Sequence, residues 1–228
     1  TKVAGLLLGN DKAYEAEATL GQTTDTDDSE GQTLLVRPVG VYSELRIQEV
    51  LQAFIGDIQQ VPPIYSALKQ GGEPMYVKAR RGDVIDLPAR TVHIHSISLN
   101  KLNADTLELS VVCGTGTYIR RLVRDLGERL GCGAHVTELR RTWVQPFQSE
   151  TLWTIEQLEA LAEQGTEALD AVLMPVEVAL SGIQKLIVDD EQARKIGMGQ
   201  KITVSNMNEA VELIQLCSPQ NRCLGLAS

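Results

Sequence analysis

Three segments of the sequence place tyrosine and arginine side chains where they could handle a nucleic-acid base. Tyr118 lies two residues before Arg120, Arg140 and Arg141 follow in the next segment, and Tyr14 stands in a separate alternating run. A base taken out of its stack needs an aromatic face to rest on, and a cation for its phosphate or for a catalytic carboxylate. Spacing by itself favours the plainer alternative, in which both tyrosines are core residues and the arginine pair is a surface feature.

The usual signatures of other enzyme classes are missing from the sequence, which contains no GxSxG, HExxH, P-loop or GxGxxG motif. Gly114-Thr115-Gly116 has two glycines rather than three. It indicates either a plain strand-to-helix turn or a helix N-terminus that could hold a phosphate. His93 and His95 are two residues apart on one expected strand, without a clear third ligand. We therefore expect no metal site.

The four cysteines give a weak indication of the compartment. Cys113, Cys132, Cys217 and Cys223 show no CxxC spacing and have no nearby histidine pair, which argues against zinc. Two disulfides in a secreted protein are one alternative, and buried or free thiols in a reducing cytosol are the favoured one. The sequence has no secretory leader and no apolar run of about 20 residues, so we expect a cytoplasmic protein outside the membrane.

Charge is unevenly distributed along the sequence. The net charge of −9 argues against a nucleic-acid partner, because Lys and Arg neutralise phosphates. Residues 118–141 are nevertheless net +3 and residues 61–91 net +2, between acidic stretches at 1–60 and 142–184. A basic stripe inside an acidic protein favours contact with RNA, and a solvated helix face with Arg–Glu pairs is the alternative. The acidic stretch 142–184 is typical of a solvated helical face.

Alternation and capping signals predict the elements that would position these residues. Polar and apolar residues alternate over 13–22, as in a half-buried strand, and Ser43 can cap a helix over 44–54. Pro62-Pro63 predicts an extended segment at a sheet edge or over a cleft. Thr115 or Thr117 is expected to cap the helix predicted over 119–130. The other predicted elements are strands at 90–99, 106–113 and 135–146 and helices at 119–130, 154–164, 166–173 and 190–196.

The order of these elements predicts an α+β fold with a largely antiparallel sheet, because strands and helices do not alternate as in a parallel sheet. From about Ile183 the sequence changes to short apolar runs, which indicates a small β-rich appendage. The chain has 228 residues, of which 43 % are hydrophobic and 22 % charged. This is a globular composition, long enough for one large domain with such an appendage.

Several segments, in order, resemble the bacterial tRNA pseudouridine-55 synthases, the TruB family. The resemblance covers nearly the whole chain, and the ordered set is highly specific. The matching segments are TK at 1–2, DKAYEAEATLGQTTDTDDSEGQ at 11–32, GDIQQVPPIYSALKQGGEPMYVKARRG at 56–82, GTYIRRLVRDLGERLGCGAHVTELRR at 116–141, LMPVEVAL at 173–180 and GMGQKI at 197–202.

The resemblance implies a pseudouridine synthase fold over residues 1–180, α+β with a mixed, mostly antiparallel sheet. It implies a small, truncated PUA-like β domain over residues 181–228. The implied reaction converts uridine 55 in the T-loop of tRNA to pseudouridine: the base is flipped out, its glycosidic bond breaks, and it is reattached through carbon 5. No metal or organic cofactor is expected. The implied protein is a cytoplasmic monomer that contacts the T-loop and stem of tRNA.

Site residues follow from the resemblance position by position. Tyr14, in the KxY motif, would stack on the flipped uracil and take part in removing the proton from carbon 5. In GTYIR, Tyr118 would contact the target nucleotide, and Arg120 would pair with the nucleophilic carboxylate and hold it ionised. Leu139 matches an apolar wall of the uracil pocket. The residues expected to contact RNA are Lys69 in the SALK motif, Arg80, Arg140 and Arg141.

The sequence departs from the family in one respect. The family nucleophile is an aspartate in a GxLDPxATG motif upstream of the segment matched by Thr1-Lys2, and the 228 residues contain no such motif. Asp25, Asp27 and Asp28 match a different family segment, TDTxD. The abrupt start without Met favours a chain that has lost an N-terminal part, and a naturally inactive remnant is the alternative. We expect the chain alone to be inactive. A non-catalytic tRNA-binding or tRNA-folding protein is the alternative function.

Overall fold

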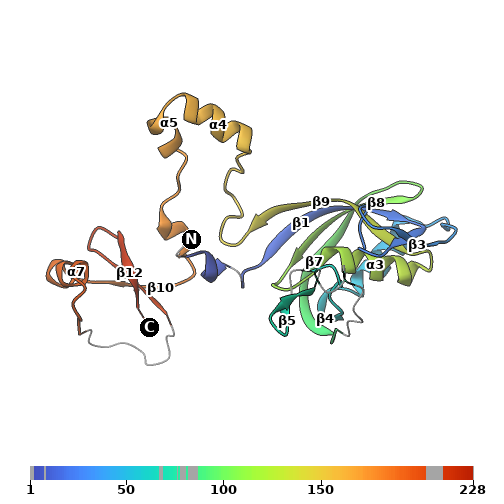
Figure 1. Cartoon of the computed structure of the whole chain (residues 1–228), viewed down its shortest axis with the longest axis horizontal. Coiled ribbons are helices and arrows are strands. Elements are labelled where there is room, and N and C mark those ends of the chain that lie inside the picture. The colour runs from blue at the N-terminus through green and yellow to red at the C-terminus, as the bar shows by residue number, and fades with distance from the viewer. Residues whose placement is uncertain are drawn as a thin grey trace. The chain divides into compact units, whose positions relative to one another are not determined.

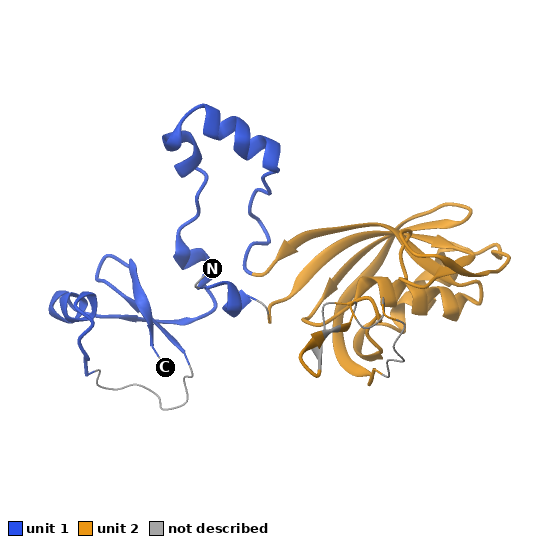
Figure 2. Cartoon of the chain, viewed as in Figure 1, with its two compact units in different colours: residues 1–7, 146–228 blue, residues 8–145 orange. Residues whose placement is uncertain are grey.

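The computed structural model describes residues 3–7, 9–66, 69–75, 77, 81, 87–203 and 213–227. The chain forms two compact units: a core unit of residues 8–145, and a second unit of residues 1–7 with 146–228 (Figure 2). The predicted domain boundary between residues 180 and 181 is a different division, and it stays a prediction.

The core unit is built on a five-stranded sheet in which every pair of neighbouring strands is antiparallel (Figure 1). The strand order is β4-β7-β8-β1-β9. The strand bounds are β1 Lys12–Leu20, β4 Gly56–Gln60, β7 Arg90–Leu102, β8 Thr106–Cys113 and β9 Ala134–Val144. The predicted antiparallel α+β fold is confirmed, and the four strands expected from alternation are present; β4, at the sheet edge, was not predicted.

Two helices cover one face of this sheet. Helix α1 (Glu44–Gln52) packs on β7, and helix α3 (Ile119–Leu130) packs on β9 and β1. Ser43 caps α1 through its side chain, as predicted. The helices and the inward residues of the strands share one apolar cluster, to which Ala16, Leu109 and Leu122 belong. Successive residues of a strand point to opposite faces of the sheet. The polar residues that alternate with these apolar ones in β1 and β8 therefore lie on the face opposite the apolar cluster.

Two short hairpins complete the described part of the core unit. Strands β2 (Gln22–Thr24) and β3 (Thr33–Val36) pair antiparallel, as do β5 (Lys69–Gln70) and β6 (Glu73–Pro74). The turn between β2 and β3 returns to the main sheet, because the backbones of Asp28 and Val136 form an isolated bridge. This turn is therefore anchored to β9.

The N-terminus of α3 differs from the prediction. Its N-cap is Tyr118, which makes no side-chain cap bond, whereas the hydroxyl of Thr117 donates to the carbonyl of Gly114. The buried carboxamide of Gln60, on β4, holds the cap instead: its Oε1 accepts from the N–H of Tyr118 at 2.8 Å, and its Nε2 donates to the carbonyl of Tyr118 at 3.2 Å. Gln60, which is 58 positions from Tyr118, thus binds a backbone N–H at the helix start. The sequence had predicted that Thr115 or Thr117 would cap this end of the helix.

Helix α3 approaches the start of β9 at a glycine. A Cβ added to Gly127 would lie 2.2 Å from the backbone nitrogen of Ala134 and 2.3 Å from the carbonyl carbon of Gly133. The Gly127 carbonyl accepts a hydrogen bond from the N–H of Gly133 at 2.9 Å. Because both neighbours are backbone atoms, they cannot rotate away as a flexible side chain could.

We expect Gly127→Ala to lower the free energy of unfolding by about 1–3 kcal/mol, the usual cost of overpacking, despite the better helix propensity of alanine. The measurement is urea unfolding followed by circular dichroism. Gly197→Ala is the matched control: it is also a helical glycine, and its added Cβ would meet nothing within 4 Å. Equal stabilities of the two variants would contradict the close packing of α3 against β9.

The second unit contains helices and a separate small sheet. In this sheet β10 and β11 are parallel, and β11 and β12 are antiparallel. Two helices close to the predicted 154–164 and 166–173 are present, with acidic residues on exposed surfaces. The bounds are η1 Ala4–Leu7, α4 Ile155–Glu163, α5 Thr166–Asp170, α6 Val176–Ala179, β10 Gln184–Ile187, α7 Asp190–Gly197, β11 Ile214–Cys217 and β12 Cys223–Ala227. The β-rich appendage is confirmed, and its PUA-like character stays a prediction.

Candidate functional site

Tyr14 lies in β1, between β8 and the edge strand β9, on the face of the sheet that the helices cover. Its register partners are Val111 on β8 and Arg141 on β9. The side chain is half-buried and packs against the apolar cluster. Burial raises the pKa of Tyr14 above 10.0, although a hydrogen bond with Arg141 acts in the opposite direction. The phenol is therefore neutral at physiological pH.

Strand β9 places a second expected site residue on the same face. Leu139 lies opposite Ala16, two residues along β1 from Tyr14, so the alternation puts Leu139, Arg141 and Tyr14 on one side of the sheet. Leu139 is 45 % exposed, so its side chain is accessible from solvent. The side chains of Tyr14 and Leu139 are thus diagonal neighbours on adjacent strands. At this separation one planar base could contact both of them.

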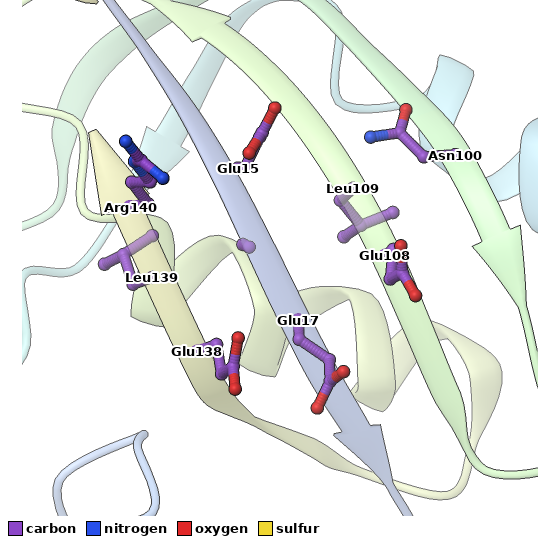
Figure 3. Close-up of a pocket in the computed structure, with 9 residues that line it drawn as sticks. Glu15, Glu17, Asn100, Glu108, Leu109, Glu138, Leu139 and Arg140 are labelled. Carbon is purple, nitrogen blue, oxygen red and sulfur yellow. The ribbon is translucent and has the colours of Figure 1, made fainter. Parts of the chain in front are cut away.

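The two consecutive arginines of β9 are separated by the sheet. Arg140 lies directly opposite Glu15, on the face away from Tyr14. This face carries a hollow of about 520 Å³, and Figure 3 shows the glutamates that line it on three neighbouring strands. The polar lining residues are Glu15, Glu17, Asn100, Glu108, Glu138 and Arg140, and Ala16, Leu109 and Leu139 also border it. Its negative charge disfavours phosphates, which argues against the RNA contact predicted for Arg140; that contact stays a prediction.

Arg120 stands in the first turn of α3 and joins three separate segments. Its Nη1 donates to Asp28 Oδ2 at 2.6 Å and to the carbonyl of Thr26 at 3.3 Å. Its Nη2 donates to the carbonyl of Tyr65 at 3.1 Å, in the chain that follows β4. Both members of the ion pair with Asp28 are three-quarters or more buried. The guanidinium therefore ties the β2–β3 turn and the Pro62-Pro63 segment to the start of α3.

The pKa values of two neighbouring carboxylates in this cluster shift in opposite directions. Burial raises the pKa of Asp27 above 3.8, although Arg124 Nη1 donates to it at 2.9 Å. Burial would also raise the pKa of Asp28, but hydrogen bonds from Thr26 and Arg120 outweigh it, and the pKa is lowered. Asp28 is thus held ionised by its donors, while Asp27 carries its charge at a cost.

A second hollow, of about 410 Å³, adjoins this cluster. Its lining residues are Asp25, Asp27, Val61, Pro62, Pro63, Ile64, Leu87, Arg121 and Arg124. Pro62 and Pro63 thus border a pocket, as expected for a segment over a cleft. The two arginines on its wall have carboxylate partners: Arg121 pairs with Asp125 at 3.1 Å, and Arg124 with Asp27.

The other expected site residues are only partly described. Tyr118 is half-buried at the start of α3, two residues from Arg120. Lys69 lies in the short β5–β6 hairpin, where it pairs with Pro74. Arg80 lies outside the described residues. Tyr118 and Arg120 therefore start the same helix, while Lys69 belongs to a separate hairpin.

Spacing did not reveal two residues of this site, Asp28 and Gln60. Asp28 was assigned only to a family segment, and it is the carboxylate that Arg120 contacts. Gln60 was part of a matched segment without an expected role, and it fixes the backbone of Tyr118. Both partnerships join residues at least 58 positions apart, so a local pattern carried no signal for them.

Each of the two histidines on β7 has an acidic partner. His93 Nδ1 lies 2.6 Å from Asp57, and His95 Nε2 lies 3.0 Å from Asp11. Within the described part of the chain, no group of three or more His, Cys, Asp or Glu side chains is arranged to hold a metal ion. The described helices also include none with the length and apolar character to span a membrane.

Comparisons with known proteins agree on one family. Residues 1–119 match the model of the TruB family pseudouridylate synthase N-terminal domain, and residues 120–181 match the tRNA pseudouridylate synthase B C-terminal domain. A tRNA pseudouridine synthase B of Xanthomonas campestris pv. campestris is 54 % identical over 202 residues, covering 89 % of this chain and 65 % of the relative. That of Mannheimia succiniciproducens is 44 % identical over 228 residues, covering 100 % of this chain and 74 % of the relative.

The fold also matches solved structures. A chain in the crystal structure of a Cbf5–Nop10–Gar1 complex superposes with a TM-score of 0.72 at 24 % identity, covering 100 % of this chain and 62 % of that chain. A chain in the structure of an H/ACA RNP bound to a substrate RNA containing 2'-deoxyuridine gives 0.71 at 22 % identity, with coverages of 99 % and 61 %. The chain spans about 65 % of the length of the first curated relatives that it matches.

Proposed function

The chain belongs to the TruB family of pseudouridylate synthases, and on that premise we propose that it serves tRNA pseudouridylation. The proposed reaction is isomerisation of uridine 55 in the T-loop, with the base flipped out of its stack and reattached through carbon 5. The observation that carries this proposal is the placement of Tyr14, Leu139 and Arg141 on one sheet face, on which the helix of Arg120 packs. The proposed partner is the T-loop and stem of tRNA, met by a cytoplasmic monomer.

Each residue has a distinct part in the proposal. The Tyr14 ring stacks on the flipped uracil, Leu139 forms an apolar wall, and the Tyr14 hydroxyl takes part in moving the proton from carbon 5. Tyr118 contacts the nucleotide from the start of α3. Arg120 has five N–H donors and makes three hydrogen bonds to its present partners. It therefore has donor capacity for the nucleophilic carboxylate, which its charge keeps ionised.

The family's nucleophilic aspartate lies in a GxLDPxATG motif, and this motif is absent from the 228 residues. We propose that the chain binds tRNA but forms no pseudouridine by itself. Activity then requires a protein in which a nucleophile-bearing segment precedes these residues. A non-catalytic tRNA-binding protein of the same family is the alternative.

The test is single-turnover pseudouridine formation on an unmodified tRNA transcript. Two proteins are compared: the 228-residue chain, and the same chain joined behind the N-terminal segment of the Xanthomonas campestris relative. We expect binding by both and pseudouridine at position 55 from the joined protein only. Turnover by the chain alone would show that another residue acts as the nucleophile. Binding without turnover by both would favour the non-catalytic alternative.

The RNA-contacting role proposed for Arg141 can be separated from its neighbour. We expect Arg141→Gln to weaken tRNA binding and to reduce the slope of log affinity against log salt by about 1, as for the loss of one phosphate contact. Arg140→Gln is the matched control, because Arg140 lies opposite Glu15 on the acidic face. The measurement is filter binding of the tRNA transcript at several salt concentrations. An equal loss in both variants would place RNA on both faces and contradict this assignment.

A further inference from the structure

The hairpin between β11 and β12 carries two of the four cysteines directly opposite each other. Cys217 ends β11, Cys223 begins β12, and the two are register partners across the antiparallel pair. The turn between them is closed by hydrogen bonds from the N–H of Ser218 to the carbonyl of Arg222 at 2.9 Å and from the N–H of Asn221 to the carbonyl of Ser218 at 2.8 Å. The register of the two cysteines is thus fixed by the backbone.

The backbone bonds also show which kind of cross-strand pair this is. The carbonyl of Cys217 accepts from the N–H of Val188, on the β10 side, at 2.9 Å. The next residue, Ser218, bonds across to Arg222. The carbonyl of Cys217 faces β10, so Cys217 and Cys223 correspond to a non-hydrogen-bonded pair, for which Cα atoms in a regular ladder lie about 4.5 Å apart. The register shifts between Leu216 and Cys217 and still sets Cys217 opposite Cys223. Disulfides occur at Cα separations of about 4.4–6.8 Å.

The two thiols are near each other and unequal in access. Cys217 is 0 % exposed, whereas Cys223 is partly exposed at the start of β12. Burial raises the pKa of the Cys217 thiol, and the nearby Cys223 adds to this effect. Solvent reagents therefore meet Cys223 first, with Cys217 beside it.

The other two cysteines have different surroundings. Cys113 ends β8 in the core unit, where it interacts with Thr117, and Cys132 follows α3 beside Tyr42. Both are buried. They provide internal controls for thiols that a small disulfide reagent reaches poorly.

We propose that Cys217 and Cys223 form a reversible disulfide by exchange with a small-molecule disulfide of the glutathione class. The Cys223 thiolate attacks one sulfur of the reagent, which forms a mixed disulfide and releases the first small thiolate. The Cys217 thiolate then attacks the Cys223 sulfur and releases the second. Two protein thiols lose two electrons and two protons, and the reagent is reduced to two thiols. This inference does not depend on the proposed function.

The linkage would fix one end of the small sheet. The N–H of Cys223 donates to Glu177 Oε1 in α6 at 2.6 Å, so a covalent bond at this position joins β11 to the strand that contacts α6. We expect oxidation to slow hydrogen exchange at the amides of β11 and β12 and to leave the sheet of the core unit unchanged.

The sequence itself provides a direct readout. Trypsin cleaves after Arg222, which separates a peptide of residues 202–222 from a peptide of residues 223–228. The full chain is incubated with oxidised glutathione under native conditions, alkylated and digested. We expect the intact monomer to lose about 2 Da and the two peptides to remain joined until a reductant is added.

Variants distinguish this linkage from simple glutathionylation. Cys217→Ser is expected to stop at the mixed disulfide on Cys223, about 305 Da heavier, and Cys223→Ser to remain unmodified. Cys113→Ser is expected to behave as the unchanged chain. The proposal is overturned if the unchanged chain retains all four thiols, accumulates the glutathione adduct on Cys223, or links either cysteine to a different partner. These outcomes are read on the unchanged chain, so they hold even if a variant folds poorly.

Discussion

Tyr14→Phe is expected to slow single-turnover pseudouridine formation by about 10²-fold or more, while tRNA affinity stays nearly unchanged. The variant keeps the aromatic ring, so stacking on the flipped base is retained. It removes only the hydroxyl, which is hydrogen-bonded with Arg141 and proposed to move the proton from carbon 5. The measurement is rapid-quench kinetics in the joined protein that carries the nucleophile segment.

The pH dependence of the reaction tests the same group. Burial raises the pKa of Tyr14 above 10.0, so the phenolate fraction at neutral pH is small and increases tenfold with each pH unit. If the phenolate is the base, the rate rises with pH between about 7 and 9 in the unchanged protein. The rate of Tyr14→Phe is expected to be flat over the same range.

Tyr42→Phe is the matched control for Tyr14→Phe. Its hydroxyl also donates within the core unit, to the carbonyl of Leu130 at 2.9 Å, but it lies outside the proposed site. We expect this variant to lose some stability and to keep its rate. A normal single-turnover rate in Tyr14→Phe would make Tyr14 a stacking platform only.

Arg120→Ala is expected to reduce turnover by about 10²- to 10³-fold and to lower the free energy of unfolding by about 2–3 kcal/mol. The loss of turnover follows because the nucleophilic carboxylate would be without its cation in a partly dry pocket, which raises its pKa. The loss of stability follows because Asp28 and the carbonyls of Thr26 and Tyr65 lose their shared donor. Single-turnover kinetics and urea unfolding measure the two effects separately.

The pH dependence of stability gives a further readout for Arg120. The pKa of Asp28 is lowered in the folded state, so its contribution is fully present above the unfolded value of 3.8 and is lost as pH falls below it. We expect the unchanged protein to lose more stability between pH 5 and pH 2 than Arg120→Ala, which has already lost this donor. The measurement is urea unfolding at several pH values in that range.

Arg120→Lys separates charge from geometry. Lysine keeps the positive charge but cannot reach three acceptors with a planar fork, so it should recover turnover and stability only in part. Arg46→Ala is a control, because Arg46 pairs with Glu49 on the exposed surface of α1. If Arg120→Ala turned over normally but bound tRNA poorly, Arg120 would belong to the phosphate-contacting surface rather than to the site.

Local patterns in the sequence determined four of the five strands of the main sheet and the helices α1 and α3. The alternation of Tyr14, Ala16 and Ala18 with polar residues gave β1, and the side chain of Ser43 gave the start of α1. These elements could be predicted because each signal depends on residues only a few positions apart. The ordered segments that resemble the TruB family indicated which family the chain belongs to. The face shared by Tyr14 and Arg141 also follows from alternation, once the register of β1 and β9 is known.

The tertiary structure alone decided which distant groups meet. Gln60 caps α3 in place of Thr115 or Thr117, because the edge strand β4 brings its carboxamide to the N–H of Tyr118. Asp28 meets Arg120 because the β2–β3 turn bridges to Val136 on β9. Such contacts depend on how strands and helices pack rather than on residue spacing. The arginine pair was split for the same reason: strand geometry sends consecutive side chains to opposite faces, and only packing decides which face the helices cover.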